Sequence, residues 1–238
     1  MRTITAIILL IAVATMQWGC KKNNDNSGTL NLEVRHEFNG SPFAFGTNYT
    51  NNLGQIYQFN TANIYLSGFT AKGSTPYTFE NTYLSISPDA STYTIDSIPA
   101  GDYTGLTFDI GIDSVANHSD PTTFPANSPL NPAHPRYQHW AWNTGYIFVK
   151  FEGDCDTSNT GIAGTAFFYH LGLDQLLRTV DIDQQFSVDP EGNATVTVTI
   201  DYAKILDDID FRQELSTHTM NNLPLATKVM DETVAAFE

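Results

Sequence analysis

Hydrophobic and polar residues alternate over many short stretches of this chain, which is the pattern of strands with one buried face. In residues 29–38, TLNLEVRHEF, every second position from leucine onwards is apolar except His36, which therefore shares the buried face. Further runs of this kind are separated by turn residues, such as those at 99–102 and 189–193. The pattern predicts an all-β fold, namely a single antiparallel β-sandwich of the immunoglobulin-like or Greek-key type.

Two segments depart from the strand pattern. Residues 113–138 contain five prolines and little periodic apolar pattern, so they predict a long loop. Loops of this length inside compact domains are usually functional. After Pro224, apolar residues recur at the spacing of one helix face, which predicts a short C-terminal helix packed on the sandwich. The residues of that face are Leu225, Val229, Met230 and Val234.

The first residues predict export. One arginine, an apolar run and small residues predict a signal peptide over residues 1–19, which is too short to span a membrane. Cleavage would leave Cys20 at the new N-terminus, where bacterial lipoproteins carry their lipid, and residues 20–28 then form a polar tether. We therefore expect a lipoprotein of the bacterial cell envelope, in the outer membrane on its periplasmic or surface face, with the sandwich over residues 29–238. A soluble secreted protein is the alternative.

Charge and cysteine content narrow the function classes. The chain has 11 basic and 26 acidic side chains, and loss of residues 1–19 would remove one arginine and no acid. Such a surface repels nucleic acid and anionic membranes, so neither is an expected partner. Once Cys20 is lipidated, Cys155 has no partner for a disulfide within the chain, and the fold must rest on its core.

Histidines are the candidate metal ligands, because imidazole suits copper and zinc and the chain lacks cysteine pairs. No HxH or HExxH motif occurs, so spacing alone is weak evidence. His36 is either a hydrogen-bonded core histidine or a ligand, and His118 is either a ligand or a brace for its turn. His170 lies at a strand end, where ligands are often presented, whereas His218 precedes the last helix and is expected only to cap it.

The segment HWAWNTGYIF, residues 139–148, concentrates aromatic side chains. In an extended strand, Trp140 and Trp142 share one face, and His139 has the opposite phase. The pair is either an aromatic stripe of the core or one wall of a metal site. Indole donates one hydrogen bond and stacks on cations, but unmodified tryptophan is not an ordinary metal ligand.

Four short motifs then appear in a fixed order. They are NHSDPT at 117–122, SPLN at 128–131, WAWNTGYIF at 140–148 and HLG at 170–172. Together they resemble the MbnP-like family of exported copper-binding proteins, which is related to the MopE and CorA copper proteins. YLSGF at 65–69 and IPAGDYTGLTFDIGID at 98–113 are also similar to that family.

The resemblance implies a β-sandwich domain that binds copper through histidines. We expect a protein that is not an enzyme and that takes copper as Cu(I) or Cu(II). Zinc is the alternative ion. In members of the family, a tryptophan is oxidised to kynurenine by a partner enzyme, a MauG-like di-haem peroxidase. Trp140 is the first choice for that residue and Trp142 the second. The metal ligands implied are His118 and His170, which match motifs. His36, in the first strand, ranks third, and His139, which lies outside the motifs, is a further candidate.

Two other function classes remain open at this point. A surface adhesion or glycan-binding sandwich would use Trp140 and Trp142 as an exposed stacking platform, whereas the copper hypothesis needs them enclosed near histidines. A hydrolase built on His118 and Asp120 is the enzymatic alternative, but no GxSxG or similar nucleophile motif supports it. Calcium would need Asp109, Asp113 and Asp120, whose spacing matches no known calcium loop.

Overall fold

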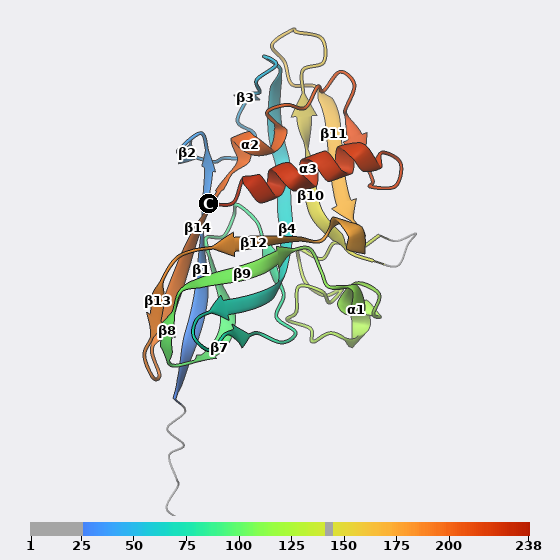
Figure 1. Ribbon diagram of the computed structural model, residues 1–238. Coiled ribbons are helices and arrows are strands. Elements are labelled where there is room, and N and C mark those ends of the chain that lie inside the picture. Colours follow the sequence, from blue (N-terminus) through green and yellow to red (C-terminus); the bar gives the residue numbers. More distant parts are fainter. Residues whose placement is uncertain (1–25, 141–144) are drawn as a thin grey trace, which may run out of the picture.

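The computed structural model describes residues 26–140 and 145–238 of the chain (Figure 1). The predicted signal peptide, Cys20 and Trp142 lie outside these residues. The described part is built mainly from strands, with few and short helices, and the predicted all-β, sandwich-like class is confirmed. No helix in this part is long and apolar enough to cross a membrane.

The strands form two main sheets. The smaller sheet contains β1 (Ser27–Phe38), β2 (Ser41–Pro42), β7 (Thr92–Pro99) and β14 (Asn193–Asp201). The central path of the larger sheet runs β12 (Arg178–Ile182), β9 (Gly105–Ile110), β4 (Ile56–Lys72), β10 (Ile147–Cys155), β11 (Thr165–Gly172) and β15 (Ser216–Thr217). The short strands β3 (Tyr49–Thr50), β5 (Tyr77–Thr78) and β6 (Leu84–Ile86) pair with β4, and β8 (Gly101–Tyr103) pairs with β13 (Phe186–Val188).

Most pairings are antiparallel, as the alternating pattern predicts, but two are parallel. Strand β1 pairs in parallel with β14, and β11 pairs in parallel with β15. Alternation along a strand shows which face is buried and not which neighbour it pairs with, so the sequence could not distinguish these cases. The second parallel pair determines the geometry of the candidate site.

One hydrophobic core lies between the sheets and under the C-terminal helix. Leu30, Leu32 and Val34 of β1 are fully or almost fully buried, as expected from their phase. Helix α3 (Leu223–Ala235) lies across the larger sheet in Figure 1 and buries Leu225 and Val229 in the same core. The predicted C-terminal helix is therefore confirmed. A shorter helix, α2 (Tyr202–Leu206), follows β14 directly.

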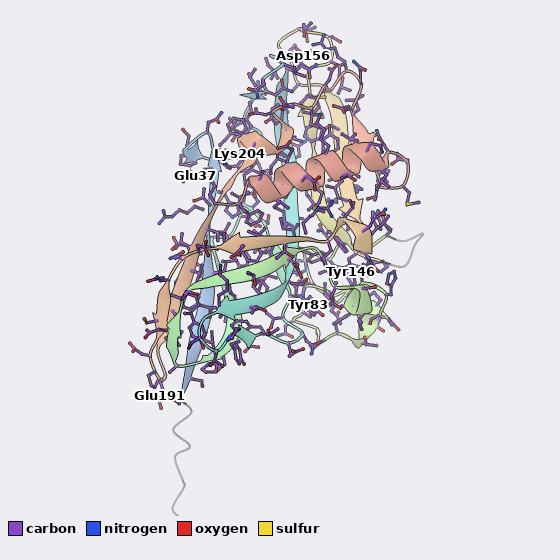
Figure 2. All side chains as sticks on the ribbon, in the orientation of Figure 1. Glu37, Tyr83, Tyr146, Asp156, Glu191 and Lys204 are labelled. Carbon is purple, nitrogen blue, oxygen red and sulfur yellow. The ribbon has the colours of Figure 1, made fainter. Side chains whose placement is uncertain are left out.

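The proline-rich segment 113–138 is an ordered excursion. It contains helix α1 (Ser114–Asn117) and a helical turn at Pro121–Thr123, each capped by an aspartate side chain. The hydroxyl of Tyr146 donates to the carbonyl of Leu130 at 2.7 Å, and Figure 2 shows Tyr146 beside α1. The hydroxyl of Tyr65 likewise donates to the carbonyl of Pro129 at 2.9 Å. Two buried tyrosines therefore fix the loop to the larger sheet.

The aspartates considered for calcium have other partners. The carboxylate of Asp113 caps α1 and accepts from the Tyr83 hydroxyl, and Asp120 caps the following turn. Asp109 accepts from the hydroxyl of Thr179 at 2.6 Å. In residues 26–140 and 145–238, no group of three or more His, Cys, Asp or Glu side chains is arranged to hold a metal ion.

Candidate metal site

Strand β11 carries core residues on one face and site residues on the other. Phe167, Tyr169 and Leu171 are fully buried in the core, so His170 points to the opposite face of the sheet. On one side of β11, His170 lies opposite Lys150 of β10. On the other side, Tyr169 pairs with Thr217 of β15. The next residue of the chain after β15 is His218, which this parallel register brings beside His170.

The imidazoles of His170 and His218 contact each other. Their Nδ1 atoms are 3.1 Å apart, their ring centroids are 4.8 Å apart, and the ring planes meet at 60°. Metal–nitrogen bonds of about 2.0–2.1 Å to both atoms would then subtend about 100° at the ion. This angle suits a three- or four-coordinate metal with two histidine ligands.

Glu152 fixes the orientation of His170. The Nε2 atom of His170 lies 2.8 Å from Oε1 of Glu152, and the ammonium of Lys150 lies 3.2 Å from the same oxygen. An ionised carboxylate only accepts, so Nε2 of His170 carries the proton and its Nδ1 accepts a hydrogen bond donated by Nδ1 of His218. A metal ion bound to both Nδ1 atoms would take the place of that proton. Glu152 is itself held by Thr61 of β4, whose hydroxyl donates to Oε2 at 3.2 Å. A carboxylate behind a ligating histidine is a frequent arrangement in metal sites.

The protonation states of His170 and Glu152 favour metal binding at neutral pH. Burial holds the pKa of His170 below its usual range, and repulsion from His218 acts in the same direction, although the hydrogen bond to Glu152 opposes both. Burial alone would raise the pKa of Glu152, but its hydrogen bond with His170 and its attraction to Lys150 lower it overall. The site therefore combines a neutral imidazole with an ionised carboxylate behind it.

Trp140 lies on the same face of β11 as His170. A Cβ atom placed on Gly172 would lie 2.5 Å from Cη2 of Trp140, so the indole fills the space over that glycine. Gly172 and His170 are two residues apart on one strand face, a spacing of about 7 Å. Trp140 is 4% exposed, and its buried Nε1 has no hydrogen-bond partner among the described residues. The structure therefore places one tryptophan and one histidine of the predicted site on neighbouring positions of one strand face.

His118 lies at the end of α1, and its ring contacts the carboxylate of Asp174. Its Nε2 atom lies 3.2 Å from Oδ2 of Asp174, which also accepts from Ser114, and the amide of Asn117 donates to the other oxygen at 2.8 Å. Asp174 follows the end of β11 by two residues, so His118 sits near that end of the strand. The ring of His118 is about half exposed and contacts a carboxylate, not another predicted ligand.

His36 and His139 use both ring nitrogens in hydrogen bonds of their own. Nε2 of His36 donates to the carbonyl of Ala90 at 3.0 Å, and Nδ1 therefore accepts from the hydroxyl of Tyr202 at 3.0 Å. Nδ1 of His139 donates to the carbonyl of Trp140, and its Nε2 accepts from the amide of Gly145. His36 thus braces the core beside α2, and His139 hydrogen bonds to Trp140 and Gly145 ahead of β10.

His218 is the residue that sequence reasoning missed. It was expected to cap the last helix, but that expectation is wrong because the side chain of Asn222 caps α3 by accepting from the amide of Leu225 at 3.2 Å. No local pattern in STHTMNN, residues 216–222, marks His218 as a metal ligand. Its role depends on the parallel pairing of β15 with β11, which only the folded structure reveals.

Comparison with known proteins agrees with the fold. The MbnP family model matches residues 27–223. The chain belongs to the MbnP family. MbnP from Methylosinus trichosporium has a similar structure, with a TM-score of 0.50 at 15% sequence identity over 77% of this chain and 80% of that chain. A search of curated proteins gave no match. The MbnP family is associated with copper, so the pair formed by His170 of β11 and His218 after β15 lies in the fold of a copper-associated family.

Proposed function

We propose that this MbnP-family protein binds one copper ion between His170 and His218, next to Trp140, and handles copper without catalysing a reaction. The observation that carries the proposal is the 3.1 Å separation of the two Nδ1 atoms. Copper lies at the top of the affinity order for divalent first-row metals, so a site of two imidazoles in an exported protein fills with copper, or with zinc when copper is scarce. Sequestration, storage and handover of the ion are all compatible with such a site.

Trp140 supports the proposal because it is enclosed rather than exposed. A glycan-binding platform needs open indole faces, whereas Trp140 is buried against Gly172, two residues along β11 from His170. We extend the proposal to oxidation of Trp140, or of Trp142, to kynurenine by a MauG-like di-haem peroxidase. Opening the indole exposes an aryl amine and a carbonyl, which can approach a metal as the intact ring cannot. The orphaned Nε1 of Trp140 is the atom that would become the amine.

The proposed location is the cell envelope. A lipid on Cys20 would anchor the protein, and the tether that follows would hold the copper-binding domain close to the membrane. The acidic composition supports a role away from nucleic acid.

The intact mass of the protein from its native host would report both the lipid and a tryptophan-to-kynurenine change. Trp140→Phe and Trp142→Phe variants would show which residue carries that change.

Copper binding can be tested directly. We expect the purified protein to bind one equivalent of Cu(I) in competition with a chromogenic chelator, and His170→Ala and His218→Ala each to weaken binding strongly. His118→Ala is the matched control, since it removes a histidine at the same end of β11 whose ring contacts Asp174. Unchanged binding by the His170→Ala/His218→Ala double variant would show that the ligand assignment is wrong. If binding were lost only in His118→Ala, His118 at the end of α1 would be the ligand instead of His170 and His218.

A further inference from the structure

Thr219, which follows His218, has an unusual conformation. It is fully buried and has φ +62°, in the left-handed region that β-branched residues rarely adopt. Residues held in such conformations persist only where the surroundings fix them, and they cluster at binding and catalytic sites. An asparagine or glycine would adopt this backbone conformation more easily, so the threonine side chain must contribute something that those residues would not.

The Thr219 hydroxyl joins the segment that follows β15 to strand β11. It donates to the carbonyl of His170 at 3.0 Å and accepts from the amide of Gly172 at 3.0 Å. These two backbone groups flank the end of β11, where His170 presents its ring and Gly172 seats Trp140. The last paired residues of β11 and β15 are Tyr169 and Thr217. Beyond them, the side chain of Thr219 continues the attachment to β11, at the residue next to His218.

We propose that Thr219 is a positioning residue that presets the separation of the two imidazoles for one metal ion. This inference rests on the proposed copper site. Because the hydroxyl ties the backbone of the His218 segment to the backbone of His170, the two rings approach each other before any metal is present. When the two histidines are already in position, binding does not have to order a loop. The ion is then bound more tightly than by two histidines on a loosely held segment.

A purely structural role for Thr219 makes a different prediction. If the hydroxyl only stabilises the fold, its removal lowers stability and leaves the copper affinity of the folded protein unchanged. Thr233 provides the matched control, since it is also fully buried and its hydroxyl donates to the carbonyl of Val229 within α3. Thr→Val at either position removes a buried hydroxyl and keeps the shape of the side chain.

The experiment compares Thr219→Val, Thr219→Ser, Thr219→Gly and Thr233→Val in the otherwise unchanged protein. Cu(I) affinity is measured by chelator competition, the Cu(II) site by electron paramagnetic resonance, and stability by urea unfolding. We expect Thr219→Val to weaken copper binding by about tenfold or more, the usual effect of removing a group that orients a ligand. Thr219→Ser, which keeps the hydroxyl, should bind nearly as the parent does. Thr219→Gly adopts the same φ without strain and should fold, yet it should bind weakly and show an altered resonance spectrum.

The outcomes separate this inference from the proposal on which it rests. Parent-like affinity in Thr219→Val and Thr219→Gly, in a protein whose binding depends on His170 and His218, overturns the role of Thr219 alone. An equal loss of affinity in Thr233→Val also overturns it, because the effect would then follow from general loss of stability. A parent protein that binds copper without regard to His170 and His218 overturns the proposed site and this inference together.

Discussion

The Nδ1 atoms of His170 and His218 lie 3.1 Å apart although 48 residues separate them in the chain. Their proximity follows from sheet register: β15 pairs in parallel with β11 at Phe168 and Tyr169, so the next residues on each strand are neighbours. The backbone of a sheet is among the more rigid parts of a protein. His170 lies on such a strand, and His218 directly follows one. The consequences for the residues around the pair can be measured.

Glu152 should be needed for full copper affinity. Glu152→Ala removes the acceptor that fixes the Nε2 proton of His170, so we expect the affinity for Cu(I) to fall by about tenfold. Glu152→Gln should be intermediate, because an amide oxygen still accepts the hydrogen bond but carries no charge. Asp154→Asn, on the same strand face and paired with Asn60, serves as the control. Chelator competition that ranks Asp154→Asn with Glu152→Ala would contradict the role of Glu152.

Acid should destabilise the protein in part through His36. Burial lowers the pKa of His36 below its ordinary value of 6.5, so the unfolded chain takes up a proton before the native protein does. The stabilising contribution is complete above pH 6.5 and is lost as the pH falls below it. His36→Gln can still hydrogen bond to Tyr202 and Ala90 but cannot titrate. We expect the free energy of unfolding of this variant, from urea titrations, to fall less steeply between pH 6.5 and 5 than that of the parent. Parallel curves would contradict this prediction.

Gly172 should tolerate no side chain. The added methyl of Gly172→Ala would meet both Cη2 of Trp140 and the carbonyl oxygen of Tyr146 at 2.5 Å. Overpacking of this kind costs about 1–3 kcal/mol of unfolding free energy and would displace the indole. In Gly164→Ala, the methyl meets no atom within 4 Å, and we expect a change within about 0.5 kcal/mol. Urea unfolding followed by tryptophan fluorescence measures both effects, and equal costs at the two glycines would refute the packing described for Trp140.

Cys155 should be inert in the native protein. Burial, followed by the negative charges of Asp154 and Asp156, raises the pKa of its thiol to about 11, so almost no thiolate exists at neutral pH. The thiol instead donates to the carbonyl of Thr165. We expect Cys155 to resist alkylation at pH 7 until the protein is unfolded, as peptide mapping would show. Copper affinity should be unchanged in Cys155→Ala, and a decrease would indicate a thiolate ligand.

The sequence predicted the fold better than the site. Alternation in residues 29–38 and helical spacing after Pro224 depend on local periodicity, and both β1 and α3 appear as expected. The two-strand register that joins His170 to His218 depends on contacts across 48 residues, which no local pattern encodes. His36 illustrates the same limit, since its phase correctly placed it toward the core, but its hydrogen bonds to Tyr202 and Ala90 come from distant segments.

The sequence motifs predicted site residues best where the whole motif lies on one strand. The HLG motif placed His170 at a strand end, and Gly172 of the same motif is the residue over which Trp140 packs. His118 came from another motif, but its side chain contacts Asp174, which also binds the side chain of Asn117. Of the ligands predicted from the sequence, His170 is the one that lies beside a second histidine.

The two faces of β11 allow the metal chemistry to change without loss of the fold. Phe167, Tyr169 and Leu171 stabilise the core, while His170 on the other face contributes to the proposed site. Replacement of His170 would leave the apolar face unchanged, so relatives that keep this sandwich can lose, gain or exchange metal ligands at little expense in stability. In this chain, β11 thus separates the two tasks: its inward residues stabilise the sandwich, and its outward histidine serves the proposed ion together with His218.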